Sequence, residues 1–185
     1  LVPAMVEPVK ERRVEFPSGR WRQWLDESRE YEGNSAETLS FELEEFPVFV
    51  RDGAVVPLEV VDGATGHGDK FCRDHLTLAV YPVDGGKQSF DLCQETSDGV
   101  RFTYEEMNGV LTLRATKTNT PILWRIRGWA DATQVDSTSS DRDFVKVPSP
   151  AHLSQHANSW TVEGKDVLWI RVADVGSGIS VRVTR

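Results

Sequence analysis

The sequence predicts an all-β protein built as two antiparallel β-sandwich domains in tandem. Short apolar runs, roughly four to seven residues long, recur along the chain and are separated by Gly, Pro, Asn and Asp. Several runs alternate apolar and polar residues with the period of two that is typical of a half-buried strand. No segment shows an unambiguous helical stripe. The turn residues between the apolar runs and the period of two therefore favour strands throughout.

The clearest predicted element is a hairpin over residues 46–58. Two runs rich in Val and Phe flank Asp52-Gly53. A two-residue type I′ turn needs positive φ at both central residues, and Asp-Gly adopts it at low cost. We therefore expect the two runs to pair with each other.

A second hairpin is predicted around Asn108-Gly109, between strands at 100–104 and 110–115. The second of these strands alternates strictly, which places one set of side chains toward solvent and the other toward a core. Val110, Thr112 and Arg114 are expected on one face, and Leu111, Leu113 and Ala115 on the other.

Further strands are predicted at 90–93, 122–126, 167–172 and 179–183. Residues 39–46 are ambiguous, because their apolar positions fit both a strand and the i, i+4, i+7 stripe of a helix. A helix would leave Phe41 on its wet face, so a strand is predicted there.

A boundary between two domains is predicted near residues 62–74, which hold three glycines and many charges. We expect a proximal domain over residues 1–75 and a distal domain over residues 76–185. A β unit as small as the first buries only about 60% of its unfolded surface, so we expect it to depend on a neighbour.

Composition excludes several classes of partner. Lys and Arg total 21 against 29 Asp and Glu, for a net charge of −8, which disfavours nucleic acid and anionic membrane surfaces. No apolar run approaches the roughly 20 residues that span a bilayer.

The chain opens at Leu1 in strand-like sequence without a charged leader, so we expect a piece of a longer protein. Cys72 and Cys93 are too few for a disulfide scaffold, and their pairing stays open.

Four blocks in the first third of the chain carry a family resemblance. They are Leu1-Val2, residues 13–21 (RVEFPSGRW), Tyr31-Glu32-Gly33 and residues 46–58 (FPVFVRDGAVVPL). In order and spacing they are similar to the region that follows the catalytic barrel in glycoside hydrolase family 31, the α-glucosidase and α-xylosidase family.

The resemblance has departures and weakens along the chain. Asn34 stands where the family has a second glycine, and Arg22-Gln23-Trp24 replaces the usual Tyr-Asp-Phe. Residues 76–82 look like the strand that enters the family's distal C-terminal domain. The acidic block common after it is absent, and residues 93–99 (CQETSDG) occupy its place.

The resemblance implies a role without catalysis. In this family, hydrolysis of an α-glycosidic bond with retention belongs to a (β/α)₈ barrel, which would lie upstream of Leu1, and no position here matches its catalytic carboxylates. We therefore expect the C-terminal β-sandwich region of a glycosidase, with the barrel of the same protein as its partner and no cofactor. A weaker alternative is an adhesion-type β-sandwich that is not related to any enzyme.

The residues themselves also predict no catalytic site. A retaining glycosidase needs two carboxyl groups about 5–5.5 Å apart. Neighbouring residues on a strand point to opposite faces, so adjacent glutamates cannot cooperate. The carboxylate pairs considered are Glu44 with Glu45, Glu105 with Glu106, Glu95 with Asp98, and Asp141 with Asp143.

No metal site is predicted. His67, Asp69, Cys72, Asp74 and His75 offer ligand types for zinc, but their spacing matches no standard zinc pattern. We interpret them as part of a charged, glycine-rich linker. His152 and His156 lie in a Pro- and Ser-rich stretch that predicts a solvent-facing loop.

Carbohydrate binding is the main alternative function. An exposed Trp ring can stack on a sugar, and Trp129 and Trp160 follow predicted strands where exposure is possible. Trp124 and Trp169 lie inside apolar runs, so we expect them in the core. The alternative is thus a carbohydrate-binding module that uses Trp129 or Trp160 as a platform for an oligosaccharide.

Overall fold

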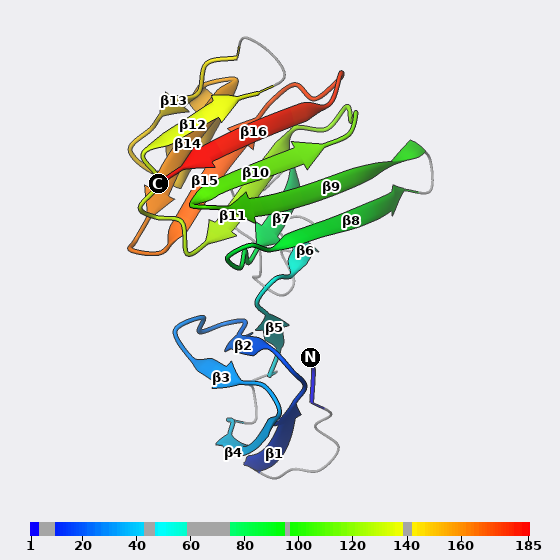
Figure 1. Ribbon diagram of the computed structural model, residues 1–185, viewed down its shortest axis with the longest axis vertical. Helices are drawn as coiled ribbons and strands as arrows, with labels where there is room; N and C mark the ends of the chain where they lie inside the picture. The colour runs from blue at the N-terminus through cyan, green and yellow to red at the C-terminus, as the bar shows by residue number, and fades with distance from the viewer. Residues whose placement is uncertain (4–9, 43–46, 59–74, 95–96, 139–141) are drawn as a thin grey trace. The chain divides into compact units, whose positions relative to one another are not determined.

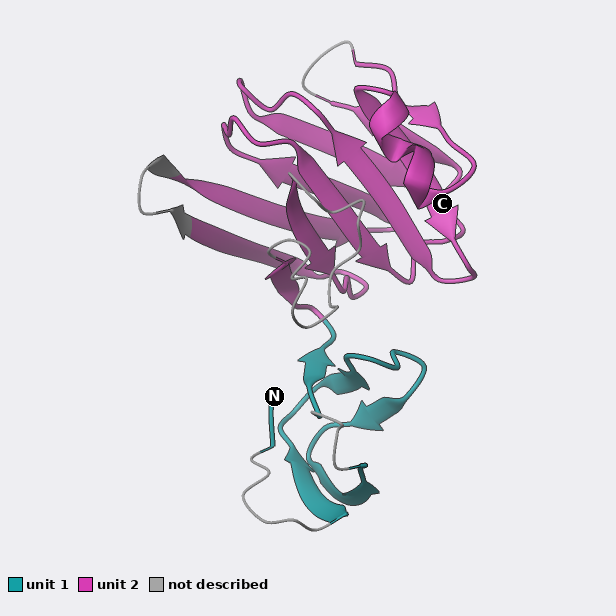
Figure 2. Cartoon of the chain, turned by 180° about the vertical axis from the view of Figure 1, so that it is seen from behind, with its two compact units in different colours: residues 1–52 teal, residues 53–185 magenta. Residues whose placement is uncertain are grey.

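The computed structural model describes residues 1–3, 10–42, 47–58, 75–94, 97–138 and 142–185. The chain forms two compact units, Leu1–Asp52 and Gly53–Arg185 (Figure 2). The described residues are nearly all strand, loop and turn, which confirms the all-β prediction. Their only helical element is the short 3₁₀ helix η2, Pro150–Gln155. No helix in the described ranges is long and apolar enough to traverse a bilayer.

Unit 1 consists of two small sheets around an aromatic cluster. Strands β1 (Glu11–Phe16) and β4 (Ser35–Ser40) form one antiparallel pair. Strands β3 (Glu30–Glu32), β2 (Arg20–Gln23) and β5 (Phe49–Arg51) form the other sheet. The buried cluster between these strands contains Val14, Phe16, Trp21, Tyr31, Phe41 and Phe49.

The rings of this cluster interlock. Phe16 stacks on Tyr31 with ring centroids 4.8 Å apart, and Phe49 meets both edge-on, at 5.1 and 5.3 Å. Stacked and edge-on arrangements are the favoured geometries of aromatic pairs. Because the unit is small, this cluster supplies most of its apolar burial.

Unit 2 is a β-sandwich of two larger sheets, which Figure 1 shows as two layers. The five-stranded sheet has the order β12-β16-β10-β9-β8. Its members are β8 (Lys87–Gln94), β9 (Ser97–Met107), β10 (Val110–Ala115), β12 (Gln134–Ser137) and β16 (Ile179–Thr184).

The six-stranded sheet has the order β13-β14-β15-β11-β7-β6. Its members are β6 (Val55–Leu58), β7 (Leu76–Val80), β11 (Ile122–Arg127), β13 (Val145–Lys146), β14 (Asn158–Glu163) and β15 (Val167–Val172). Its strand pairs are antiparallel except for two, because β7 runs parallel to β11 and β13 parallel to β14. Between β7 and β11 the chain passes through the other sheet and returns in the same direction, which produces a parallel neighbour.

The predicted hairpin over 46–58 is wrong. Strand β5 pairs with β2, whereas β6 pairs with β7 in the other unit. Gly53 has φ +91° but Asp52 does not have positive φ, so the two residues do not form a type I′ turn. The Asp52 carboxylate instead accepts a hydrogen bond from Arg22 Nε at 2.8 Å, and the chain continues from one sheet into the next.

The second predicted hairpin is confirmed. Asn108 and Gly109 have φ of 54° and 75°, as a type I′ turn requires, and β9 pairs with β10 in the expected register. The predicted alternation is present in β10, where Leu111, Leu113 and Ala115 are buried and the residues of the opposite face are not. The strands predicted at 90–93, 122–126, 167–172 and 179–183 are also present as β8, β11, β15 and β16.

In the ambiguous segment the strand β4 ends at Ser40, Phe41 is buried, and residues 43–46 lie outside the described residues. The predicted domain boundary at 75/76 adjoins residues 59–74, which the structure also leaves undescribed. It stays a prediction beside the observed division of the compact units after Asp52.

Candidate functional site

The adjacent glutamates Glu105 and Glu106 point to opposite faces of β9, as predicted. Glu105 lies on the outer face, where it pairs with Lys87 and Arg114, and the hydrogen bond from Arg114 lowers the pKa of its carboxyl group. Glu106 is only 4% exposed, and its carboxylate accepts hydrogen bonds from the backbone N–H groups of Gly85 and Gly109. The pair cannot act together on one substrate, and Glu106 has a structural role in two turns.

The other predicted carboxylate pairs are not placed. Glu44, Glu45, Glu95 and Asp141 lie outside the described residues. The structure therefore lacks both members of the pair Glu44 with Glu45. It also lacks one member of the pair Glu95 with Asp98 and one member of the pair Asp141 with Asp143.

Of the predicted linker residues with metal-ligand chemistry, only His75 is described. Its Nε2 accepts a hydrogen bond of 2.8 Å from Arg171 Nε, and burial lowers the pKa of this arginine. Cys72 lies outside the described residues, as do His67, Asp69 and Asp74. Within the described ranges no three His, Cys, Asp or Glu side chains gather as metal ligands would.

The stretch around His152 and His156 is not the loop that was predicted. Residues 150–155 form η2, because Pro150 suits the first helical turn and lacks an N–H that would need a partner. Leu153 is buried in a small cluster with Trp169 on the outer face of the six-stranded sheet. His152 contacts the Ser149 hydroxyl at 2.8 Å, so its ring takes part in the start of this helix.

The four Trp residues of unit 2 are all buried. Trp124 is buried in the core between the sheets, and Trp169 is buried in the smaller cluster with Leu153, so both are covered as predicted. Trp129 is 2% exposed and Trp160 is 5% exposed, so their expected exposure is wrong. Arg185 lies over the Trp129 ring at 4.0 Å and Lys146 over the Trp160 ring at 4.5 Å, which covers the faces that a sugar would use.

Burial of these rings leads to a prediction about sugars. Malto- and xylo-oligosaccharides at millimolar concentration should leave the Trp fluorescence of the chain unchanged, because no face of Trp129 or Trp160 is free to stack. A saturable change that is lost in Trp129→Ala or Trp160→Ala would instead support the carbohydrate-binding hypothesis.

The sequence blocks that carry the family resemblance form a packing motif in unit 1. Trp21 Nε1 donates a hydrogen bond of 2.8 Å to the Pro17 carbonyl, which ties the ring to the turn before it. A Cβ on Gly33 would lie 2.3 Å from the carbonyl oxygens of Pro17 and Gly19, so only glycine fits there. Blocks that are distant in sequence thus meet at one backbone crossing, which explains their residue types without chemistry.

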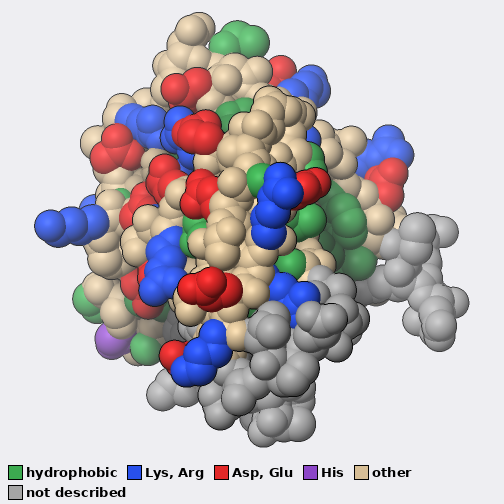
Figure 3. All heavy atoms as spheres, turned by 90° about the horizontal axis from the view of Figure 1, so that it is seen from below, with side chains coloured by type: hydrophobic (Ala, Val, Ile, Leu, Met, Phe, Trp, Pro, Cys, Tyr) green, Lys and Arg blue, Asp and Glu red, His purple; other side chains and the backbone are tan. Residues whose placement is uncertain are grey.

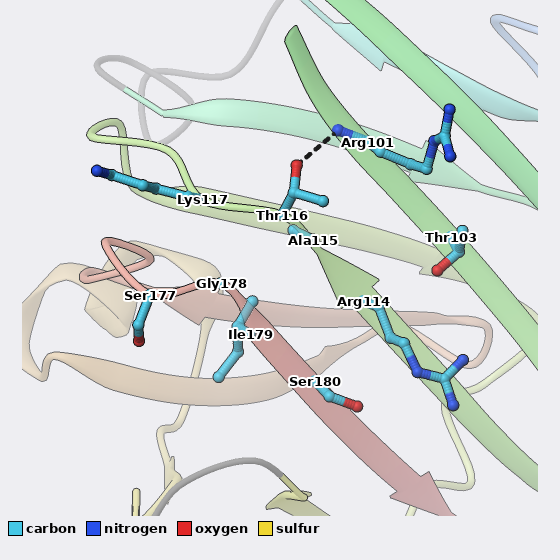
Figure 4. Close-up of a pocket in the computed structure, with 10 residues that line it drawn as sticks. All are labelled: Arg101, Thr103, Arg114, Ala115, Thr116, Lys117, Ser177, Gly178, Ile179 and Ser180. Carbon is cyan, nitrogen blue, oxygen red and sulfur yellow. Dashed lines mark hydrogen bonds between the residues drawn. The ribbon is translucent and has the colours of Figure 1, made fainter. Parts of the chain in front are cut away.

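A groove lies on the outer face of the five-stranded sheet, with a volume of about 680 Å³. Figure 4 shows its floor, formed by β9, β10 and β16, and its wall, formed by residues 115–117 and the turn at Ser177-Gly178. Sequence reasoning did not find it. Its basic residues, Arg101, Arg114 and Lys117, are far apart in the chain or sit on strand positions that look like ordinary solvent-facing charges.

The two arginines of this groove are held in place from one side. Arg101 binds Asp91 through two hydrogen bonds, at 2.6 and 2.9 Å, which lower the pKa of Asp91 and raise that of Arg101. Arg114 reaches Glu105 at 3.4 Å. The bonds to Asp91 favour the ionised form of Arg101 and orient its guanidinium group.

The comparisons with known proteins agree with the packing motif. The family model described as the glycosyl hydrolase family 31 C-terminal domain matches residues 1–56. Residues 1–56 are thus similar to the C-terminal domain of glycoside hydrolase family 31. It is 32% identical over 108 residues to alpha-glucosidase 2 from Bacillus thermoamyloliquefaciens, a match that covers 57% of the chain and 13% of that protein.

Two solved structures share the fold along nearly the whole chain. A dextranase of this family from Flavobacterium johnsoniae covers 100% of the chain with a TM-score of 0.77 and 16% identity. The cycloalternan-forming enzyme from Listeria monocytogenes covers 99% with a TM-score of 0.81 and 16% identity. The chain spans only 25% and 18% of these two proteins, respectively. Its fold therefore matches one part of these larger proteins.

Proposed function

We propose that this chain is the non-catalytic part of a retaining α-glycoside hydrolase and that it stabilises the catalytic barrel of the same polypeptide. The observation that carries the proposal is the family 31 C-terminal match over residues 1–56, whose motif residues serve packing in unit 1. The larger protein would hydrolyse O-glycosyl bonds, and this region would contribute no reacting group.

The placement of the acidic residues supports a role without catalysis. Across the described ranges, the one predicted carboxylate pair whose members are both placed, Glu105 and Glu106, is split between two faces of a strand. Glycoside hydrolysis with retention needs two carboxyl groups that face each other across about 5–5.5 Å. The charged surface that Figure 3 shows mixes acidic and basic side chains, as an ordinary solvated face does.

Exposed apolar side chains in unit 1 support contact with another domain. Leu1, Val2 and Leu25 are exposed, and Leu25 is 57% accessible. Leu1 exchanges backbone hydrogen bonds with Phe49, while Trp24, next to Leu25, donates its backbone N–H to Val48. These apolar residues therefore flank the same segment, Val48-Phe49, from its two sides, and an adjoining barrel would remove them from water.

The test compares three proteins: the full-length parent, the parent truncated before Leu1, and the 185-residue chain alone. The parent should hydrolyse p-nitrophenyl α-glycosides, and the chain alone should not. The truncated parent should lose at least 10-fold in activity and unfold at a lower temperature, because the barrel loses its packed neighbour. Full activity and an unchanged Tm in the truncated parent, or turnover by the chain alone, would overturn the proposal.

A point variant separates docking from folding. In the full-length parent, Leu25→Asp should lower the Tm of the barrel, since it puts a charge into the apolar contact. Val145→Asp, at another exposed apolar position, in unit 2, is the matched control and should leave the barrel Tm unchanged. Both variants should leave the unfolding of the 185-residue chain close to that of the native sequence.

A further inference from the structure

The charged side chains that line the groove on the five-stranded sheet are all basic, and Asp91 and Glu105 pair with two of them from beside it. The net charge of the chain is −8, yet the residues that line the groove include three basic side chains and no acidic one. The basic residues are Arg101 on β9, Arg114 on β10 and Lys117 in the loop that follows β10. Basic side chains that line a concave surface attract anions.

The arginines reach the groove from neighbouring strands. Arg114 lies opposite Thr103 in the β9–β10 register, so Arg101 and Arg114 are diagonal neighbours on the outer face. The Thr116 hydroxyl accepts a hydrogen bond of 2.9 Å from the Arg101 backbone N–H, which fixes the loop beside β9 (Figure 4). The bonds to Asp91 use Nε and Nη2 of Arg101, and the bond to Glu105 uses Nη1 of Arg114. Other guanidinium N–H groups of both residues thus remain for a ligand.

Hydroxyl groups continue the groove beyond the arginines. Ser180 lies opposite Arg114 in the β10–β16 register, and its hydroxyl is held by Thr138 at 2.7 Å. Thr103 lines the floor and Ser177 the wall. Such side chains can both donate and accept hydrogen bonds, which suits a ligand that bears hydroxyl groups of its own.

From this arrangement we propose that the groove binds a small hydroxylated oxyanion, such as a sugar that carries a phosphate or carboxylate group. Arg101, Arg114 and Lys117 bind the anionic group, since guanidinium and oxyanion form charge-assisted, forked hydrogen bonds. The serine and threonine hydroxyls bind the rest of the molecule. A volume of about 680 Å³ is larger than one tetrahedral anion needs and lies within the range of small-molecule sites.

Neutral glucans fit the groove less well. None of the residues that line it is aromatic, so a sugar ring finds no platform to stack on. Recognition therefore has to come from charge and hydrogen bonds. This site is independent of the proposed function, because the groove lies in unit 2 and its binding does not depend on a barrel.

The test is a titration of the 185-residue chain followed by two-dimensional ¹⁵N–¹H NMR at low salt. The probes are glucose 6-phosphate, inorganic phosphate and glucose. Glucose 6-phosphate should shift the amides of residues 114–117 and 177–180 in a saturable way, with a Kd at least 3-fold below that of inorganic phosphate. Glucose should cause no shift, and 300 mM NaCl should weaken binding several-fold.

Variants assign the binding to the groove. The double variant Arg114→Gln/Lys117→Gln should weaken binding of glucose 6-phosphate at least 10-fold. The control Lys165→Gln/Arg182→Gln removes the same charge outside the groove and should bind like the native chain. Ser180→Asp, which places a carboxylate in the groove, should abolish binding as well. Absence of saturation by 50 mM glucose 6-phosphate, equal affinity for inorganic phosphate, or equal loss in the control variant would each overturn the proposal.

Discussion

Phe49→Ala should unfold unit 1 while unit 2 stays folded. Phe49 is 2% exposed, and its ring meets Phe16 and Tyr31 edge-on and also contacts Phe41. Truncation of a buried Phe to Ala costs about 3–5 kcal/mol. A unit of this size has only a few kcal/mol of stability in total, so the loss is comparable to all of it. The NMR amide signals of residues 10–42 should collapse to random-coil shifts, and those of residues 97–138 should keep theirs.

Leu25→Ala is the matched control for this experiment. Leu25 belongs to the same unit but is exposed, so its truncation should change stability by less than about 0.5 kcal/mol. If Phe49→Ala left the spectrum of unit 1 intact, or if both units unfolded together, the aromatic cluster would not be the separate core of unit 1.

Glu106→Ala should destabilise unit 2 by roughly 2–3 kcal/mol. One carboxylate joins two turns, because Oε2 accepts from the Gly85 N–H and Oε1 accepts from the Gly109 N–H at 2.9 Å. Hydrogen bonds to a charged group are worth more than neutral ones, and removal leaves both donors without this partner. The measurement is urea-induced unfolding followed by the fluorescence of the buried Trp residues of unit 2.

Glu105→Ala is the control, one residue away on the same strand. Glu105 lies on the outer face and pairs with Lys87 and Arg114 at 3.4 Å, so its loss should cost no more than about 1 kcal/mol. Glu106→Gln should fall between the two, since the amide keeps one oxygen acceptor but turns a donor toward the other N–H. Equal effects at positions 105 and 106 would contradict the turn-bridging role of Glu106.

The two predicted hairpins show which strand pairings a local turn sequence can and cannot predict. Asn108-Gly109 forms the expected turn, and its flanking strands β9 and β10 pair with each other. Asp52-Gly53 has an equally good turn signal, but β5 finds β2 and β6 finds β7. Turn preference acts between adjacent residues, whereas the choice of a strand partner depends on the burial that each pairing gives.

The Trp residues show the same limit for the candidate site. Position in the sequence suggested exposure for Trp129, which follows a strand. The cation over its ring comes from Arg185, whose guanidinium also donates to the carbonyl of Gly128, 57 residues away in sequence. No local sequence pattern predicts a contact between residues so far apart in the chain. The basic groove was missed for the same reason, because its residues come from separate strands.

The sequence alone determined the strand class, the alternation of faces along strands such as β10, the second hairpin and the resemblance of residues 1–58 to family 31. These follow from residue period, turn chemistry and short motifs, all of which act over a few neighbouring positions. Only the tertiary structure decided which strands pair, that β7 and β11 run parallel, that Trp129 and Trp160 are covered, and that Arg101, Arg114 and Lys117 share one groove. Those features depend on contacts between residues far apart in the chain, where burial and charge pairing outweigh local preference.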